Sequence, residues 1–482
     1  MNYAIISRVI GRLMLFVGAA MVPSLLIAGI KREADFFAFS TTILLLLILG
    51  FSFSFFSKNL SKKSLKIKDA LTIVSLGWIV SAGFGALPFT ISGVLPNYFD
   101  AFFEAVSGFT TTGATVIDNV EILPAGLLFW RSFMHWLGGM GILVLALAIM
   151  PTVGVGGFQL FKAESPGPIA DKVVPKMKDT AKLLYTAYFG ITAIQTILLL
   201  FGGMTLYEAL IHTFGTVGTG GFSTRNASIG AFNSSYIMVI ITIFMVASGV
   251  NFSLYYALYK GEIKSFLSNP EFRVYLAIIG VAGLLVTLNI RSIYPDFFSA
   301  LRHGFFQVSS IMTTTGYGTA DFDLWPTFSR MVLFFLMFVG GCAGSTGGSI
   351  KVIRIMILFK MFKREVSKLL HPRAMVAIQC NGKLLSTDVI AGVTGFFFLY
   401  LMLFAGGALF LSFENISFFS AVSASAACLG NIGPGFEAVG ATQTYSFFST
   451  PSKFMLSVLM LFGRLELFTF FALLTPKYWI RD

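Results

Sequence analysis

Four short segments rich in threonine and glycine contain the residues of this sequence best suited to chemistry. FFEAVSGFTTTG (residues 102–113) and FFQVSSIMTTTG (305–316) agree at seven of twelve positions without a gap. YEALIHTFGTVG (207–218) and FSAVSASAACLG (419–430) keep the length and the final glycine. Backbone carbonyls along an extended strand can replace the water shell of a cation, and glycine at the centre allows the unusual backbone angles that this requires. The repetition therefore predicts four walls of one cation-binding site.

The last residues of these segments are predicted to form an ion filter centred on four glycines. One such string is weak evidence, since glycine and threonine often meet in turns. Four strings at near-equal spacing, each after a short apolar segment of re-entrant length, are strong evidence. Helix-connecting turns in a secondary transporter are the alternative. The predicted filter residues are Thr111, Thr112, Gly113, Thr216, Val217, Gly218, Thr314, Thr315, Gly316, Cys428, Leu429, Gly430 and Asn431.

A second glycine-rich segment, GGCAGSTGGS at residues 340–349, interrupts the long apolar run 328–362. Glycine at this density breaks a helix, and backbone freed at membrane depth must face protein or a water-filled path. We predict that the segment gates such a path; a simple helix break for packing is the alternative. A nucleotide-binding loop is excluded because no GK[ST] follows and no strand precedes it. The predicted gate residues here are Gly340, Gly341, Gly344, Ser345, Gly347 and Gly348.

One arginine, Arg464, lies inside the last apolar run, 453–474. A charge at membrane depth costs about 2.5–3.5 kcal/mol on insertion scales and usually has a partner or a function. Glu466 points to a different helix face, so the two are not expected to pair. We predict that Arg464 belongs to the gate and interacts with carbonyls of the glycine-rich segment. A structural ion pair between helices is the alternative.

Other polar residues in apolar surroundings receive blander interpretations. Arg131 and His135, one turn apart near the outer start of a span, are expected to be interfacial rather than catalytic. His212 and His303 are expected to pack or form hydrogen bonds rather than bind a metal, because neither has a second histidine nearby. The three cysteines are widely spaced without a CxxC pair, which favours neither a disulfide framework nor a zinc site.

The composition indicates which elements must position these residues. The chain has 482 residues, of which 56% are hydrophobic and 12% charged, and its mean hydropathy is +0.82. The charged share is about half that of a soluble domain, whereas lipid is a good solvent for the apolar surface of a polytopic helical protein. The net charge of +12 does not indicate nucleic-acid binding, because the basic residues fall in short interhelical loops.

Ten apolar runs are long enough to span a bilayer, and each repeat reads as span, short pore helix, filter strand and span. We predict an all-α polytopic membrane protein with four such repeats, pseudo-fourfold symmetric around one pore, and an N-terminal helix pair. The runs are 10–30, 38–57, 70–93, 126–150, 183–203, 236–259, 273–290, 328–362, 387–411 and 453–474. The predicted units are the N-terminal pair at 1–68 and pore repeats at 69–151, 152–260, 261–383 (with the broken inner helix) and 384–482.

The distribution of lysine and arginine predicts the orientation. With both termini cytoplasmic, most of the 34 basic residues fall on the inner side, and loop acids such as Asp118, Asp296 and Glu437 fall on the outer side. The largest basic group lies at residues 351–383. It is either a docking surface for a cytosolic partner or a topology determinant alone.

At this point the sequence resembles the Trk/Ktr/HKT superfamily, in particular the bacterial TrkH/TrkG-type potassium uptake subunits. The similarity spans essentially the whole chain and includes the extra helix pair, the four filter strings, GGCAGSTGGS and LFGRLELFT at 461–469. Glycine at all four central positions resembles the K⁺-preferring pattern of the superfamily. Cys428 replaces the usual filter threonine and Asn431 an aromatic or small residue, so the fourth wall departs from the pattern.

The resemblance implies a transporter, not an enzyme, that spans the bacterial cytoplasmic membrane many times, with K⁺ as the transported ion and no organic cofactor. It implies that the glycine-rich segment obstructs the pore below the filter, with Arg464 beside it. It also implies a homodimer controlled by a separate cytosolic, TrkA-like subunit that binds nucleotide.

Two other classes of function remain to be weighed. An ion-coupled secondary transporter of an organic solute would have broken helices in inverted halves, whereas the repeat here is forward and fourfold. An intramembrane enzyme would need a cluster of His, Asp or Glu on facing helices, and the sequence offers none.

Overall fold

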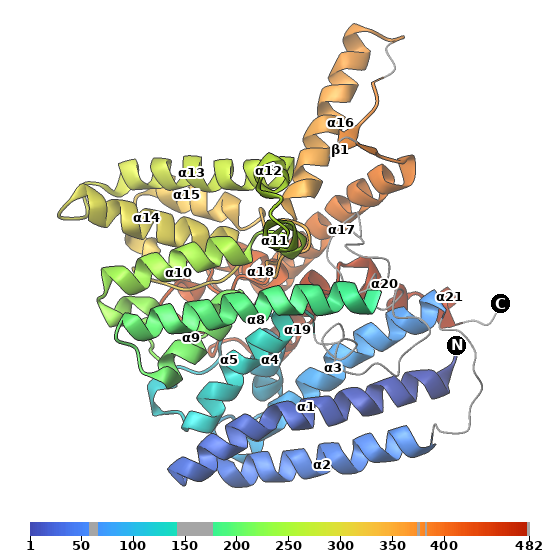
Figure 1. Cartoon of the computed structure of the whole chain (residues 1–482), viewed down its shortest axis with the longest axis vertical. Helices are drawn as coiled ribbons and strands as arrows, with labels where there is room; N and C mark the ends of the chain where they lie inside the picture. Colours follow the sequence, from blue (N-terminus) through green and yellow to red (C-terminus); the bar gives the residue numbers. More distant parts are fainter. Residues whose placement is uncertain (57–65, 142–176, 374–375, 381–382, 480–482) are drawn as a thin grey trace.

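The computed structural model describes residues 1–56, 66–141, 177–373, 376–380 and 383–479. Most of this backbone is helical, because a helix satisfies its own N–H and C=O groups where lipid offers no partners. The helices pack side by side in one bundle, from which α16 projects as an arm (Figure 1). Beside the arm, a short antiparallel ladder joins β1 (Gln379–Cys380) to β2 (Lys383–Leu384).

The N-terminal helices α1 (Tyr3–Lys31) and α2 (Asp35–Phe56) form a hairpin along one side of the bundle (Figure 1). Their backbones touch at Gly11 and Gly50, since a Cβ added at either glycine would lie 2.9 Å from the carbonyl oxygen of the other. Two glycines facing each other allow this close approach.

The turn between α1 and α2 attaches the hairpin to the rest of the protein. Glu33 accepts a hydrogen bond from Ala125 N (2.6 Å), and Asp35 accepts one from Leu127 N (3.1 Å). Both donors belong to the first turn of a helix, where N–H groups lack partners and carboxylates are stabilising. The hairpin therefore caps the third helix of the first repeat.

Four repeats follow, each with a long helix, a short pore helix packed against it, and a third helix. Repeat 1 has α3 (Ile67–Ile91), α4 (Tyr98–Phe109) and α5 (Ala125–Gly139); repeat 2 has α8 (Met177–Phe201), α9 (Leu206–Val217), α10 (Ser235–Ser248) and α11 (Phe252–Tyr259). After α12 (Ile263–Ser268), repeat 3 has α13 (Pro270–Ile290), α14 (Phe297–Met312), α15 (Thr327–Leu336) and α16 (Val352–Leu370). Repeat 4 has α17 (Thr387–Leu411), α18 (Phe418–Leu429), α19 (Thr450–Arg464), α20 (Phe468–Leu474) and α21 (Pro476–Trp479). Short 3₁₀ helices lie in connections: η1 (Val120–Ile122), η2 (Ser228–Phe232), η3 (Phe322–Leu324), η4 (Ser412–Glu414) and η5 (Glu437–Val439).

The pore helices α4, α9, α14 and α18 begin at side chains suited to capping. The N-cap residues are Asn97, Thr205, Asp296 and Ser417, and the side chain of each accepts a hydrogen bond from a backbone N–H of the first turn. Such caps satisfy donors that a helix start otherwise leaves free. Each re-entrant helix therefore has a start that is fixed by its local sequence.

The third helix of each repeat is short, which corrects part of the sequence interpretation. In repeat 2, α10 and α11 meet at a bend of 96°, and in repeat 4 the chain breaks at Glu466 and Leu467, whose φ angles are 59° and 49°. The runs predicted as spans at 236–259 and 453–474 are therefore broken helices rather than single straight ones. The break predicted in 328–362 is confirmed, because α15 ends at Leu336 and α16 begins at Val352.

Within the described ranges, six helices are long and apolar enough to cross a membrane, or seven if the bent α10–α11 pair is one span. The run predicted at 126–150 begins as α5, which ends at Gly139, and continues into residues outside the description. The other three runs that were predicted as spans, 236–259, 328–362 and 453–474, are interrupted by the breaks described above.

The outward faces of the long helices are apolar, as a lipid environment requires. Contiguous exposed apolar side chains along a whole helix face mark a contact with membrane or with a partner rather than with water. Examples on α2, α13 and α17 are Leu44, Ile48, Phe51, Val281, Leu284, Leu288, Phe398, Met402 and Leu409. The predicted fold class, an all-α polytopic membrane protein, is confirmed.

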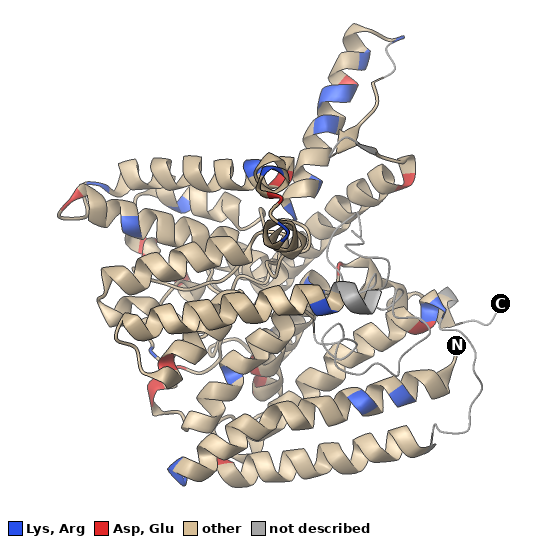
Figure 2. Ribbon diagram, viewed as in Figure 1, with Lys and Arg blue, Asp and Glu red and all other residues tan. Residues whose placement is uncertain are grey.

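Charged residues lie mainly at helix ends and on the arm (Figure 2). Asn2 N donates to Asp69 at 2.8 Å, and Tyr478 shares a hydrogen bond with Thr72 at 2.9 Å, so α1 and α21 both meet the start of α3. The described ends of the chain therefore lie on the same side of the bundle.

Candidate functional site

Each pore helix ends in the same hydrogen-bonded turn. In repeat 1, Thr111 N donates to Gly108 O (3.2 Å) and Thr112 N donates to Ser107 O (2.9 Å), which is the Schellman motif. The bonds equivalent to the second one are Gly220 N to Gly215 O (2.8 Å), Thr315 N to Ser310 O (2.8 Å) and Ile432 N to Ala427 O (2.9 Å). The four helix ends can therefore be aligned residue by residue.

The residue after each cap has a left-handed backbone. These residues are Thr111 (φ 57°), Thr219 (57°), Thr314 (58°) and Asn431 (53°). Glycine usually occupies this position of the motif, and a β-branched residue there is a genuine outlier. Strain of this kind persists where the surroundings enforce it, often at functional sites.

Two residues further on, each repeat has a glycine with positive φ. These four residues, here called the ring glycines, are Gly113 (φ 82°), Gly221 (79°), Gly316 (81°) and Gly433 (97°). A Cβ at any of them would overlap or closely approach a carbonyl oxygen of the next repeat. The pairs are Gly113 with Gly220, Gly221 with Thr315, Gly316 with Ile432, and Gly433 with Thr112.

These pairs form a closed cycle, because repeat 1 meets repeat 2, 2 meets 3, 3 meets 4, and 4 meets 1. The four walls predicted from the sequence therefore surround one centre. Both the backbone angle and the close approach require glycine at these positions.

The central glycines predicted in repeats 2 and 4 lie three residues before the ring glycines. Gly218 and Gly430 are C-caps with φ angles of −72° and −79°, equivalent to Thr110 and Thr313 and not to the ring glycines. Thr216, Val217, Cys428 and Leu429 lie within α9 and α18, because both pore helices continue to the cap. The residues that sequence reasoning missed are Thr219, Gly220, Gly221, Ile432 and Gly433.

A sequence signal for this alignment exists in repeat 4 but not in repeat 2, where Thr216 also stands two residues before Gly218. A threonine or asparagine stands two residues before each ring glycine, at Thr111, Thr219, Thr314 and Asn431. Asn431 is therefore the counterpart of three threonines rather than of an aromatic residue. Cys428 precedes the cap by two residues and does not replace a filter threonine.

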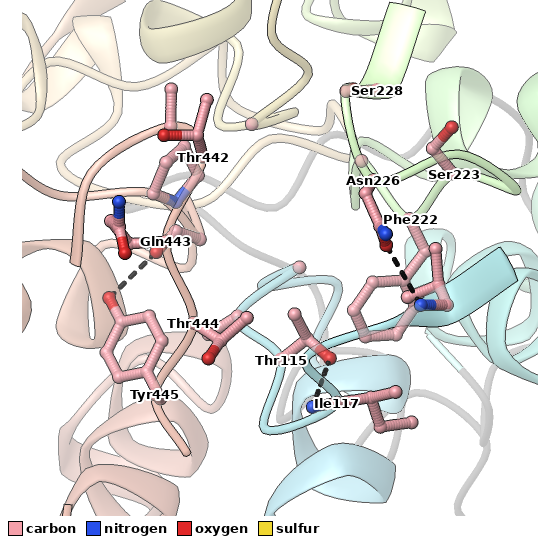
Figure 3. Close-up of a pocket in the computed structure, with 18 of the residues that line it drawn as sticks. Thr115, Ile117, Phe222, Ser223, Asn226, Ser228, Thr442, Gln443, Thr444 and Tyr445 are labelled. Atoms are coloured by element: carbon pink, nitrogen blue, oxygen red, sulfur yellow. Dashed lines mark hydrogen bonds between the residues drawn. The ribbon is translucent and has the colours of Figure 1, made fainter. Parts of the chain in front are cut away.

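A cavity of about 110 Å³ lies against the ring (Figure 3). All four ring glycines line it, together with residues that follow them in the chain, including Thr115 and Phe222. Asp118 also lines it, and the hydroxyls of Thr444 and Ser446 hold the pKa of its carboxyl below the usual range. The cavity is therefore lined by polar groups, by the Asp118 carboxylate and by two arginines, Arg131 and Arg225, each of which pairs with a glutamate.

Hydroxyl and amide side chains form two kinds of hydrogen bond at the ring, one within a wall and one between walls. In repeats 1 and 3, the cap threonine bonds to the threonine before the ring glycine: Thr110 to Thr112 (2.8 Å) and Thr313 to Thr315 (2.7 Å). In repeat 4, Asn431 donates across the boundary to Thr112 (3.0 Å) and also to Met460 O (2.9 Å). The fourth wall is thus bonded both to the first wall and to α19.

The glycine-rich loop, residues 340–349, lies on the other side of the ring from the cavity. Gly348 N donates to Thr314 Oγ1 (2.6 Å), and a Cβ at Gly347 would lie 3.2 Å from Thr313 O. These contacts are made to Thr313 and Thr314, which precede ring glycine Gly316. The cavity, in contrast, is lined by the ring glycines and by residues that follow them. The loop therefore occupies the space directly beneath the ring.

The loop is also fixed to the helix break of repeat 2. Cys342 N donates to Gly249 O (2.8 Å), Thr346 Oγ1 donates to Ser248 O (3.1 Å), and Phe252 N donates to Gly344 O (3.1 Å). The bend between α10 and α11 frees carbonyls that a continuous helix would use itself.

Glu271, which sequence reasoning missed, holds the loop and the start of α16. One oxygen of this buried side chain, at the start of α13, accepts from Ala343 N (2.7 Å) and from Ile353 N (3.1 Å). Hydrogen bonds to a charged acceptor are stronger than neutral ones. No local pattern marks Glu271, because its partners lie some 70 to 80 residues away.

Arg464 joins the loop to repeat 1. Its guanidinium donates to Thr346 O (2.8 Å), Gly138 O (2.6 Å) and Gly139 O (2.6 Å). The predicted contact with loop carbonyls is present. Glu466 pairs with Arg354 of α16. Lys351, fully within the protein, donates to Gly347 O.

These features can be compared with known proteins. A profile of the TrkH family, described as a cation transport protein family, matches residues 36–479. The chain is 40% identical over 486 residues to the Trk system potassium uptake protein TrkH of Escherichia coli (strain K12), covering 99% of this chain and 100% of the relative.

This chain belongs to the TrkH family of cation transport proteins.

Another relative and a solved structure agree with the family assignment. The Trk system potassium uptake protein TrkG of E. coli is 34% identical over 484 residues, with 98% of each chain covered. The crystal structure of the potassium transporter TrkH from Vibrio parahaemolyticus matches with a TM-score of 0.89 and 38% identity, covering 100% of both chains. The resemblance inferred from the sequence motifs is confirmed, and the TrkH family is one of transporters rather than enzymes.

Within this TrkH-family chain, Arg131 and His135 are not interfacial as expected. They are 1% and 0% exposed, and both lie behind the ring. Arg131 pairs with Glu104 of α4, and His135 Nδ1 is 2.8 Å from Gly108 O. The interpretation failed because α5 is covered by α4 of its own repeat, by α9 of repeat 2 and by the N-terminal helix α1.

His212 and His303 form hydrogen bonds, as expected. His212 lies 3.0 Å from Ser223 Oγ and 2.7 Å from Glu208 O, and His303 lies 3.0 Å from Thr319 Oγ1. Among the described residues, no group of three or more His, Cys, Asp or Glu side chains is arranged to hold a metal ion.

Proposed function

We propose that this chain carries K⁺ across the cytoplasmic membrane through the centre of the ring. The observation that supports this most is the closed cycle of ring glycines and neighbouring carbonyls at the floor of the polar cavity. Carbonyl rings of this kind replace the water shell of an ion. The pore helices also direct their carbonyl ends toward the centre, which favours a cation. The relatives are named as potassium uptake proteins.

In this proposal the filter consists of the residues from the left-handed position to the ring glycine in each repeat. They are Thr111, Thr112, Gly113, Thr219, Gly220, Gly221, Thr314, Thr315, Gly316, Asn431, Ile432 and Gly433. K⁺ is the transported substrate, and no organic cofactor takes part. The N-terminal pair at 1–68 and the repeats at 69–151, 152–260, 261–383 and 384–482 are kept as proposed units, except that α3 of repeat 1 begins at Ile67.

The glycine-rich loop and Arg464 form the proposed gate. The loop lies directly under the ring, and short backbone segments without helix or sheet can be released by breaking a few hydrogen bonds. Arg464 of repeat 4 and Glu271 and Thr314 of repeat 3 hold the loop, which also bonds to the helix break of repeat 2 at Ser248. A movement of the third helices relative to one another would therefore change its position.

We further propose that both termini and the α16 arm face the cytosol. The arm carries Lys360, Lys363, Arg364 and Lys368 in one helix (Figure 2), as the positive-inside rule favours for an inner segment. This basic arm is the proposed docking site of a cytosolic nucleotide-binding subunit. The protein is proposed to act as a homodimer in the membrane.

Uptake of ⁸⁶Rb⁺ by proteoliposomes containing the purified chain, with and without competing K⁺, Na⁺ or organic solutes, tests this function. We expect Rb⁺ uptake that K⁺ suppresses and Na⁺ suppresses weakly. Failure to take up Rb⁺, together with growth of a K⁺-uptake-deficient host remaining unsupported at low K⁺ even with a cytosolic subunit, would contradict the proposal. Uptake that depends on an organic solute would favour a coupled transporter instead.

A further inference from the structure

A second set of equivalent residues lies behind the ring, six residues before each cap. The members are Glu104, His212, Gln307 and Ala424. Each of the three polar members is fully buried and reaches from its pore helix to the strand that leaves the ring. This position therefore determines how that strand is supported, and its chemistry differs in every repeat.

Repeat 1 alone has an ionised pair at this position, among the described residues. Glu104 accepts hydrogen bonds from Thr115 Oγ1 (3.0 Å) and Val116 N (3.0 Å), and from Arg131 Nε (2.8 Å). Arg131 Nη2 also donates to Thr115 Oγ1 at 3.2 Å. Thr115 follows ring glycine Gly113 by two residues, so the pair fixes the strand immediately after the ring.

The same pair contacts repeat 2, and its strand contacts repeat 4. The guanidinium of Arg131 lies 4.0 Å from the centre of the Phe222 ring, and Phe222 directly follows ring glycine Gly221. On the other side, Tyr445 N of repeat 4 donates to Thr115 O at 2.8 Å. Support of the first strand is therefore shared with both neighbouring walls.

The corresponding contacts in the other repeats are neutral. His212 is 3.0 Å from Ser223 Oγ, and Gln307 donates to Ala320 O at 3.2 Å. Ala424 cannot reach the strand with a polar group, and the adjacent Ser423 accepts from Phe436 N instead (3.0 Å). Charged hydrogen bonds in a dry interior are roughly twice as strong as neutral ones, so the first wall is held most firmly.

We propose that Glu104 and Arg131 are positioning residues that set the cation selectivity of the ring by fixing the strand at Thr115. The inference rests on the proposed K⁺ transport. Discrimination between K⁺ and Na⁺ depends on the spacing or number of carbonyls offered to the ion. A firmly held wall keeps its carbonyls at the distance suited to K⁺, whereas a looser wall can close on the smaller Na⁺.

Thr115→Val and Thr115→Ser provide the first test, because both leave the ion pair intact. Uptake of ⁸⁶Rb⁺ and ²²Na⁺ into proteoliposomes is measured for each, with KM and Vmax determined separately. We expect Thr115→Val to lower the Rb⁺/Na⁺ uptake ratio about fivefold, the range of coupling for residues in one hydrogen-bond network. Thr115→Ser keeps the hydroxyl and should restore the wild-type ratio.

Glu104→Gln provides the second test, with Glu208→Gln as its matched control. Glu208 also lies on a pore helix and pairs with an arginine, Arg225, but that pair is partly exposed, whereas Glu104 and Arg131 are buried. Glu104→Gln should lower the Rb⁺/Na⁺ uptake ratio at least as much as Thr115→Val does. The double variant that combines Glu104→Gln with Thr115→Val should lower this ratio no further. Glu208→Gln should leave it unchanged.

The outcomes separate this inference from the function on which it rests. Wild-type protein that takes up no Rb⁺ would refute the proposed function itself. Wild-type selectivity retained by folded Thr115→Val and Glu104→Gln proteins would overturn only the positioning role. If Glu104→Gln is not recovered from the membrane, the two Thr115 variants decide the matter alone: equal ratios for valine and serine would overturn it.

Discussion

The ring and the layer directly beneath it are built by the same four repeats but with different regularity. At the ring, each repeat contributes the same Schellman turn, a left-handed residue and a glycine. Beneath it, repeat 2 bends by 96°, repeat 3 inserts the glycine-rich loop, and repeat 4 breaks at Glu466. Four equivalent walls at the ring suit a site for one ion at their centre. The unequal segments beneath the ring allow one element, such as the loop, to move without the others.

The largest expected effect distinguishes a ring glycine from a cap glycine in the same repeat. Gly433→Ala places a Cβ 2.6 Å from Thr112 O at a φ of 97°, so we expect a loss of Rb⁺ uptake of at least about tenfold. Gly430→Ala has a φ of −79°, and the Ile432 side chain beside it can yield, so uptake should fall by less than about threefold. Equal losses in proteoliposome uptake would contradict the alignment of the four walls.

The next effect concerns the layer beneath the ring. Arg464→Ala removes three hydrogen bonds between α19, the loop and α5. We expect Rb⁺ flux without any cytosolic subunit to rise about threefold or more, because each charged hydrogen bond contributes about 1.5–3 kcal/mol.

Arg302→Gln is a matched control for Arg464→Ala. Arg302 lies on the pore helix α14 and donates an exposed hydrogen bond to Ser235 at the start of α10 (2.7 Å). The flux of this control variant should equal that of the wild type. Unchanged flux and gating in Arg464→Ala would exclude this arginine from the gate.

A smaller effect of the same sign is expected at Glu271. Glu271→Gln keeps an oxygen acceptor for Ala343 N and Ile353 N but removes its charge, so basal flux should rise about twofold. Glu262→Gln, an exposed position nine residues away at the start of α12, serves as the control. A lower basal flux in Glu271→Gln would mean that this residue opens the loop rather than holds it.

The smallest effect is expected in the cavity above the ring. Because hydroxyl groups lower the pKa of Asp118, its negative charge is present above the ordinary carboxyl range and is lost only as the pH falls well below it. Asp118→Asn should raise the KM for Rb⁺ about twofold at low ionic strength, with little change at high salt. The difference between the two proteins should stay constant from about pH 5 to 8; a difference that vanished at pH 6 would contradict this role.

The sequence predicted the fold class and the number of walls, because those follow from apolar length and from a repeat near 100 residues long. It misplaced the filter in two walls because glycine serves both as a helix cap and as a ring residue. Only the tertiary cycle distinguishes Gly218 from Gly221, whereas in repeat 4 Asn431 marks Gly433 in the sequence and Cys428 precedes Gly430. Repeats 1 and 3 avoided the ambiguity since their caps are Thr110 and Thr313.

Of the residues that hold the proposed gate, Arg464 could be predicted from the sequence and Glu271 could not. Arg464 could be identified because a charge inside an apolar run is costly wherever it lies. Glu271 could not, since a glutamate in the first turn of a helix is common and its partners come from distant sequence. The breaks in α10–α11 and α19–α20 depend on contacts between repeats that no local pattern contains.

The central claim is that one ion path passes through the ring glycines. Crystals of the protein grown in Rb⁺, measured at the rubidium absorption edge, test this claim most directly. The account predicts an anomalous peak on the axis shared by Gly113, Gly221, Gly316 and Gly433, and its loss in K⁺-free Na⁺ medium. Rubidium peaks located only beside Gly218 and Gly430, or only away from the junction of the four repeats, would contradict it.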